Sequence, residues 1–146
     1  MTDPRLPFFL YGTLLPGESN HALLHGRALS WAAAELPGAL LFHGPGYPYA
    51  VADPAGSGVV RGELAELVVD AAEEYAEVLA ALDRLEEYAP GDPANLYERR
   101  AVTVRGERGQ TRAWTYFAAD RIARELLRSG EPVAGGDWRL RLRPGR

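Results

Sequence analysis

One segment of the chain, residues 71–88, is patterned as a long amphipathic helix, and most segments around it are patterned as strands. At about 100° per residue, its apolar side chains gather on a single face. They are Tyr75, Val78, Leu79, Leu82 and Leu85. Asp70 and Glu73 have the spacing of a capping box, and Pro90 is expected to stop the helix at about Tyr88. The chain is therefore expected to pack one principal helix against a sheet.

Apolar or alternating runs typical of strands occur on both sides of this helix. They are residues 6–11, 27–41 (with a bend at 37–38), 59–69, 97–105, 112–118 and 138–143. Residues 97–105 and 112–118 flank a glycine-bounded turn and are expected to form a hairpin. A short helix is expected at 120–129. Because the strands mostly follow one another directly, we expect one α+β domain over residues 1–146: a mixed, barrel-like curled β-sheet with one main helix and one or two short helices.

The composition restricts the chemistry that the chain can perform. It has no cysteine, and all sixteen basic residues are arginine, so lysine is absent too. These absences exclude thiolate catalysis, disulfides, a lysine Schiff base and a standard P-loop. The sequence also lacks the Gly-x-Ser-x-Gly elbow of serine hydrolases. If the protein is an enzyme, then carboxylates, tyrosines, hydroxyls and backbone amides must carry out the reaction.

Charge and hydropathy limit the partners and the location. The formal net charge is −4, which provides no footprint for general nucleic-acid binding. No apolar run reaches the roughly eighteen residues of a membrane helix, and the N-terminus does not resemble a signal peptide, so we expect a cytoplasmic protein without a membrane partner. His21 and His25 are four apart, but Ala22 replaces the glutamate of a His-Glu-x-x-His site, so no metal is expected.

A carboxylate, Glu86, falls within the apolar stripe of the helix, four residues after Leu82 and seven after Leu79. A carboxylate directed at a core is costly unless it is paired or neutralised, and burial raises its pKa. Such a group suits proton transfer near neutral pH. The alternative is that the helix frays at Leu85 and Glu86 lies at its solvated end. The neighbouring Glu87 is expected, by its helical angle, to point away.

Three motifs follow one another along the chain. They are residues 9–14 (Phe-Leu-Tyr-Gly-Thr-Leu), residues 82–86 (Leu-Asp-Arg-Leu-Glu) and residues 97–99 (Tyr-Glu-Arg). In this order they resemble the gamma-glutamylcyclotransferase-like family, which includes AIG2-like and gamma-glutamylamine cyclotransferase proteins. The resemblance extends from Phe8 to about Phe117. It implies that an amine is released from a small gamma-glutamyl amide while the glutamyl part closes to 5-oxoproline. The substrate's own α-amine is the nucleophile, so no cofactor is implied.

The resemblance also implies roles for individual residues. The family's catalytic glutamate, a general acid and base, corresponds to Glu86. Its substrate-binding positions correspond to Tyr11, Gly12, Thr13, Leu14, Tyr97 and Tyr116. The alternatives are a strand-exit turn without a ligand at 11–14, and ordinary aromatic packing for the last two tyrosines. Arg99 has two candidate partners, a substrate carboxylate and the internal Asp83. The segment 46–49 resembles one near the family's pocket mouth and is expected to be structural.

One departure from the family concerns the residue after the catalytic glutamate. Many relatives have glycine there, whereas this chain has Glu87, and two carboxylates facing one pocket would titrate together. The main rival to an enzyme is a non-catalytic AIG2-like domain that binds or senses a small molecule. A third reading is a tailoring enzyme that removes a gamma-glutamyl protecting group from a biosynthetic amine. The sequence carries no indication of the leaving amine or of the oligomeric state.

Overall fold

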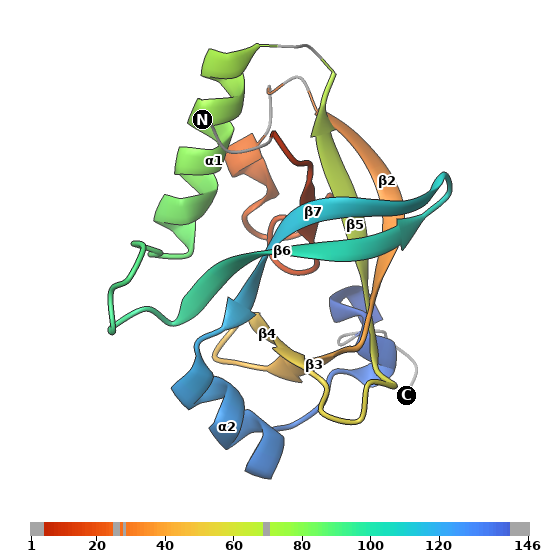
Figure 1. The fold of residues 1–146 in the computed structure, drawn as a ribbon, viewed down its shortest axis with the longest axis vertical. Helices are drawn as coiled ribbons and strands as arrows, with labels where there is room; N and C mark the ends of the chain where they lie inside the picture. Colours follow the sequence, from red (N-terminus) through yellow and green to blue (C-terminus); the bar gives the residue numbers. More distant parts are fainter. Residues whose placement is uncertain (1–4, 25–26, 28, 69–70, 141–146) are drawn as a thin grey trace.

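The structure is a computed structural model that describes residues 5–24, 27, 29–68 and 71–140. Five strands close into a barrel in the order β1-β5-β2-β6-β7 (Figure 1). Their bounds are Phe8–Leu10 (β1), Leu29–Pro37 (β2), Val59–Leu67 (β5), Tyr97–Gly106 (β6) and Gly109–Ala118 (β7). The barrel closes through a parallel contact between Phe8 and Trp114, while its other strand pairs are antiparallel. The expected α+β fold with a mixed, curled sheet is confirmed.

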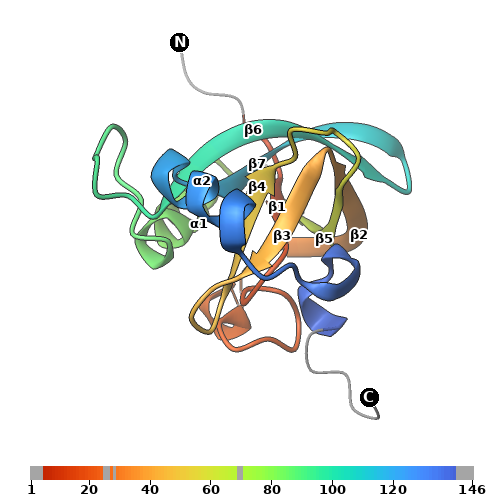
Figure 2. The same cartoon turned by 90° about the horizontal axis from the view of Figure 1, so that it is seen from below.

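The remaining elements lie around this barrel. A two-stranded sheet is formed by β3 (Ala39–His43) and β4 (Pro48–Ala52). Helix α1 spans Ala72–Leu85, and α2 spans Asp120–Ser129 as expected. The described residues also form three short 3₁₀ helices: η1 (His21–Leu24), η2 (Ala134–Gly136) and η3 (Trp138–Leu140). Helix α1 runs beside the barrel, and Figure 2 shows α2 in front of β3 and β4. No helix in the described ranges has the length and apolar character that crossing a membrane requires.

The apolar run at the N-terminus becomes a short strand that is buried on both of its faces. Side chains alternate across a strand, so neighbouring residues enter different parts of the core. Phe8 packs in the cluster beside α1, where its ring stacks on Tyr75 at 5.4 Å. Phe9 packs with Val60 and Val104 in the second cluster. Because both faces of β1 are buried, the loop that follows it starts from a rigid support.

The bend and the hairpin that the sequence predicts are both confirmed. Pro37 ends β2, and Gly38 has a φ of 81°, a left-handed conformation that glycine adopts without strain. The next residue, Ala39, begins β3. In the hairpin, Gly106 pairs with Gly109, so β6 and β7 are joined by a two-residue turn. The hairpin therefore holds its two strands in a defined register along their whole length.

Helix α1 ends earlier than the sequence predicts. Its last residue is Leu85, and Pro90 plays no part in ending it. The N–H of Glu87 donates to the carbonyl of Arg84, and the N–H of Tyr88 donates to that of Asp83. These two bonds form a Schellman motif, which satisfies carbonyls at the end of a helix. At the other end, the N-cap is Ala71 and makes no side-chain cap; the predicted cap, Asp70, lies outside the described residues.

The prediction of an edge strand at residues 138–143 is wrong for residues 138–140, the part that the structure describes. Residues 138–140 form a 3₁₀ helix, and residues 141–143 lie outside the described ranges. Trp138 is buried in the second cluster, the one that contains Phe9. Arg139 forms ion pairs with Glu63 and Asp137. The Asp137 carboxylate also accepts the N–H of Arg139. At residues 138 and 139, the apolar and basic pair is a buried tryptophan followed by an ion-paired arginine.

Candidate active site

A cavity of about 180 Å³ lies where the end of β1, the end of α1 and the start of β6 meet. It is smaller than the roughly 300–1,000 Å³ of pockets for drug-sized ligands, so it suits a group of amino-acid size. All seven residues named from the sequence contribute to its wall. They are Tyr11, Gly12, Thr13, Leu14, Glu86, Tyr97 and Tyr116. The tertiary structure thus brings together residues that are up to 105 positions apart in the chain.

Glu86 is the C-cap residue of α1, and its N–H still donates to the carbonyl of Leu82 at 3.0 Å. The helix does end at Leu85, as in the fraying alternative, but Glu86 is partly buried in the cavity wall. Its carboxylate has no hydrogen-bond or ion-pair partner within the described part of the chain. Burial raises the pKa of Glu86 to about 7. Near neutral pH the group can therefore both accept and deliver a proton.

The loop at residues 12–14 lines the same cavity. The carbonyl of Gly12 accepts the N–H of Leu15, and the carbonyl of Thr13 accepts the N–H of Asn20. The Asn20 side chain also donates to the Thr13 hydroxyl at 3.0 Å. By contrast, the N–H groups of residues 12–14 donate to no acceptor among the described residues. Free N–H groups in a partly enclosed loop can bind a carboxylate or a developing oxyanion.

Gly12 is needed for packing as well as for access. A Cβ atom at this position would lie 2.8 Å from Cγ of Pro48, the first residue of β4. The loop is supported from its other side by His21, whose Nδ1 lies 2.8 Å from the carbonyl oxygen of Leu14. The His21 ring also packs against Trp31. These contacts hold the loop in place beside the cavity.

Histidine and acidic residues provide no metal site in the described structure. No group of three such residues is arranged to hold a metal ion within the described ranges. His21 has the supporting role described above, and His25 lies outside the described residues.

Three tyrosines in the wall use their hydroxyl groups to tie the elements together. The Tyr11 hydroxyl donates to the main-chain carbonyl of Tyr116 at 2.6 Å and accepts the N–H of Ala50 at 3.3 Å. The Tyr97 hydroxyl donates to the carbonyl of Pro48 at 2.7 Å. Burial raises the pKa of all three phenols well above the ordinary value, so they remain neutral. Tyr97 also shows the aromatic packing that was the alternative to substrate binding. Its ring stacks on that of Tyr49, with 4.9 Å between the ring centroids.

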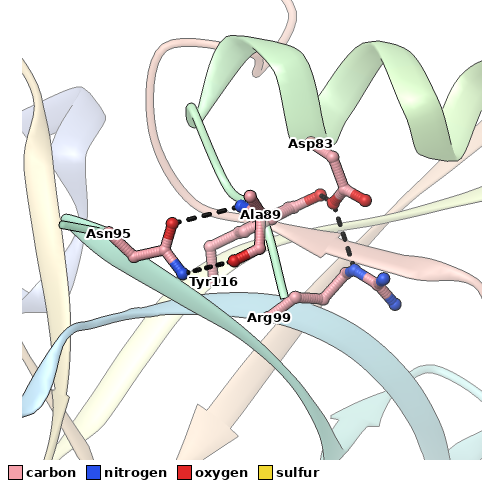
Figure 3. A network of polar contacts seen from close by, with 5 residues as sticks. All are labelled: Asp83, Ala89, Asn95, Arg99 and Tyr116. Carbon is pink, nitrogen blue, oxygen red and sulfur yellow. Dashed lines mark hydrogen bonds and ion pairs between the residues drawn. The ribbon is translucent and has the colours of Figure 1, made fainter. Parts of the chain in front are cut away.

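The third tyrosine belongs to a polar network beneath the cavity, shown in Figure 3. The Tyr116 hydroxyl donates to Oδ1 of Asp83 at 2.5 Å, and Nε of Arg99 donates to the same oxygen at 3.1 Å. The Arg99 guanidinium also lies over the rings of Trp114 and Tyr88. Of the two candidate partners of Arg99, a substrate carboxylate and Asp83, the structure shows Arg99 paired with Asp83. The network ties the end of α1, which carries Glu86, to the β6–β7 hairpin.

Sequence reasoning missed Asn95, which fastens the loop after α1. This side chain is only 3% exposed. Its Oδ1 accepts the N–H of Ala89 at 3.1 Å, and its Nδ2 donates to the carbonyl of Ala89 at 2.8 Å (Figure 3). The available signal was an asparagine that ends a proline- and glycine-rich loop, because buried amides are seldom left unpaired. Asn95 thereby closes the loop of residues 89–95 on itself.

The helical angle from which Glu87 was expected to point away does not apply to it. That angle holds only in a continuing helix, whereas Glu87 lies beyond the helix end with a φ of 53°. It is exposed, and it is one of the residues that line the cavity. Two adjacent glutamates therefore border the same space, one partly buried and one largely solvated.

The raised pKa of Glu86 predicts how stability depends on pH. The native carboxyl titrates at about 7, against an ordinary value of 4.5 in the unfolded chain, so the native state binds more protons between these values. The contribution of Glu86 to the free energy of unfolding should therefore fall as pH rises from about 4.5 to 7, by up to about 3 kcal/mol. Urea unfolding at pH 5 and pH 8 measures this fall.

The matched comparison uses Glu86→Gln, which cannot titrate and should lack that component of the pH dependence. Glu107→Gln, in the exposed hairpin turn, makes the same charge change and should keep it. A constant difference in stability between wild type and Glu86→Gln across this pH range would contradict the raised pKa.

Comparisons with known proteins agree with the fold. Residues 8–140 match the family described as gamma-glutamyl cyclotransferase, AIG2-like. A curated relative, the gamma-L-glutamyl-butirosin B gamma-glutamyl cyclotransferase of Niallia circulans, is 36% identical over 109 residues, which are 74% of this chain and 64% of that protein. The chain thus spans slightly less than two thirds of that relative.

Solved structures with the same fold include YkqA from Bacillus subtilis and an AIG2-like protein from Mus musculus. The match to YkqA has a TM-score of 0.60 and 26% identity, and covers 91% of this chain and 39% of YkqA. The match to the mouse protein has a TM-score of 0.58 and 22% identity, and covers 78% and 77% of the two chains. The family match over residues 8–140 and the 36% identical relative together show that this chain belongs to the gamma-glutamyl cyclotransferase, AIG2-like family.

Proposed function

We propose that this chain is a gamma-glutamyl cyclotransferase, which releases an amine or amino acid from a small gamma-glutamyl amide and forms 5-oxoproline. The observation that carries the proposal is the unpaired carboxyl of Glu86, with a pKa raised to about 7, in one cavity wall with the free N–H groups of residues 12–14. The 36% identical relative, a gamma-glutamyl cyclotransferase by name, supports the same reaction class. The absence of cysteine and lysine from the sequence is compatible, because this reaction needs no enzyme nucleophile.

In the first half of the proposed reaction, the Glu86 carboxylate takes a proton from the α-ammonium of the substrate. The neutral α-amine then attacks the carbonyl carbon of its own γ-amide, and the new C–N bond closes a five-membered ring. Negative charge develops on the former carbonyl oxygen. The N–H groups of residues 12–14 are the donors in the wall suited to this oxygen or to the α-carboxylate.

In the second half, protonated Glu86 delivers its proton to the nitrogen of the leaving amine. The original C–N bond breaks and the carbonyl re-forms. The ring nitrogen gives up its second proton to the departing amine, so the products are 5-oxoproline and the amine in its ammonium form. Glu86 returns to its carboxylate form, so the cycle consumes no cofactor. A pKa near the operating pH serves both halves, since the group must be a base first and an acid afterwards.

The main rival function is a non-catalytic binding or regulatory domain. Such a domain has little use for Glu86, because desolvating an unpaired carboxyl destabilises the fold without improving recognition. The Glu86 environment therefore favours the enzyme over the binding module.

The proposal is tested by incubating the protein with a panel of gamma-glutamyl amines and peptides and detecting 5-oxoproline by mass spectrometry. We expect release of 5-oxoproline and of the amine in equal amounts from at least one member of the panel, with no added metal or cofactor. Binding of panel members without any 5-oxoproline would instead support the binding module.

A further inference from the structure

Glu87 occupies a backbone position that ordinarily belongs to glycine. It is the C′ residue of the Schellman motif that ends α1, and it is the non-glycine residue with positive φ among those described. The left-handed conformation is strained for a residue with a Cβ atom and unstrained for glycine. Local backbone energetics therefore favour glycine at this position. The presence of a glutamate there calls for an explanation outside the helix end itself.

The charges around the cavity supply that explanation. The described residues that line it include two acidic residues, Glu86 and Glu87, and no arginine or histidine. The Glu87 carboxylate has no ion-pair partner within the described ranges, and the nearby Arg99 is already paired with Asp83. Both glutamates also lie at the C-terminus of α1, where the helix dipole contributes further negative potential. The cavity mouth is therefore suited to positive charge.

The glutamyl part of a substrate cannot account for both carboxylates. It carries one α-ammonium and one α-carboxylate, so its net charge is zero, and Glu86 alone is enough to receive the ammonium proton. The negative charge of Glu87 is then left for the other end of the substrate, the leaving amine. Tyr47 lies in the same wall, and its ring is a second group that attracts cations.

We propose that Glu87 is a specificity-determining residue that selects gamma-glutamyl amides whose leaving amine carries an additional positive charge, such as the mono-amide of a diamine. This inference rests on the proposed cyclotransferase function. It assigns no chemical step to Glu87: the carboxylate attracts the distal ammonium of the leaving group and is released with it when the amine departs. An anionic leaving group meets repulsion at the same place.

The test uses three gamma-glutamyl amides of the same chain length and different charge: those of 1,4-diaminobutane (cationic), butylamine (neutral) and 4-aminobutyric acid (anionic). For the wild-type protein we expect kcat/KM to fall in that order, with the difference mainly in KM. Because the pair is partly solvated, we expect about a fivefold preference for the cationic over the neutral amide. The preference should shrink as salt is added.

Two variants separate specificity from folding. Glu87→Gln removes the charge, and Glu87→Gly also relieves the left-handed strain, so the second variant should fold at least as well as wild type. Both should lose the preference for the cationic amide. Glu107→Gln, in the exposed turn between β6 and β7, makes the same charge change far along the chain and should keep the preference.

The outcomes distinguish this inference from the function on which it rests. Equal kcat/KM for the three amides in wild type, or a cationic preference that survives in both Glu87 variants, overturns the role of Glu87 while leaving the cyclotransferase intact. Absence of 5-oxoproline from all three amides and from the wider panel overturns the proposed function, and the inference with it.

Discussion

Replacing Glu86 by glutamine is expected to lower kcat by about 10²–10⁴-fold, the usual contribution of a general acid–base group. Glutamine has nearly the same shape but can neither take the proton of the α-ammonium nor deliver one to the leaving amine. The Glu86 carboxylate has no hydrogen-bond or ion-pair partner among the described residues, so the change breaks no such contact there. We therefore expect the circular dichroism spectrum and the affinity for a non-hydrolysable gamma-glutamyl analogue to be unchanged. Turnover is measured as 5-oxoproline formed at substrate saturation.

The control for this experiment is Glu107→Gln, which removes one carboxylate from an exposed turn outside the cavity wall. It should keep the kcat of the wild-type protein. A Glu86→Gln variant that turns over at a near-normal rate would remove Glu86 from the mechanism. The loop N–H groups at residues 12–14 and proton transfer through water would then have to account for catalysis.

Replacing Asp83 by alanine is expected to lower the free energy of unfolding by about 3 kcal/mol, the cost typical of breaking a buried ion pair from one side. The side chains of Asp83 and Arg99 are only 21% and 14% exposed. Without Asp83, the Arg99 guanidinium keeps its aromatic neighbours but loses its counter-charge, and the Tyr116 hydroxyl loses its acceptor. Urea unfolding at pH 7 measures the change. Activity should fall as well, because Asp83 ties the end of α1 to the hairpin.

Two further variants make this prediction specific. Asp120→Ala removes the carboxylate of an exposed pair with Arg100, and its cost should stay below about 1 kcal/mol. The double variant Asp83→Ala/Arg99→Met removes both charges and should recover part of the stability that Asp83→Ala loses. Equal losses for the Asp83 and Asp120 variants would show that the network in Figure 3 contributes no more than a surface ion pair.

Periodicity in the sequence was sufficient to predict the main elements of the fold. The 3.6-residue period of α1 reflects burial of one face, which follows from side-chain direction alone, whereas β7 is buried at four consecutive residues, 115–118. The hairpin and the bend at Gly38 were predictable because their glycines have strong local conformational preferences. The strand predicted at residues 138–140 is instead a 3₁₀ helix, because contacts from outside the segment decide its structure. Trp138 is buried, and Arg139 forms an ion pair with Glu63, 76 positions away, and no local pattern contains that contact.

For the candidate site too, some features follow from the sequence and others only from the tertiary structure. The sequence by itself determined that Glu86 is a carboxylate in an apolar stripe, and that the resemblance joins it to residues 11–14. Only the tertiary structure decided that α1 ends at Leu85, that Glu87 borders the cavity, and that Tyr116 and Arg99 share Asp83. The physical reason is the separation along the chain of the residues that interact. Helical and strand periods depend on neighbours within a few residues, whereas charge balance and hydrogen-bond partners in a cavity depend on residues that only the closed barrel brings together.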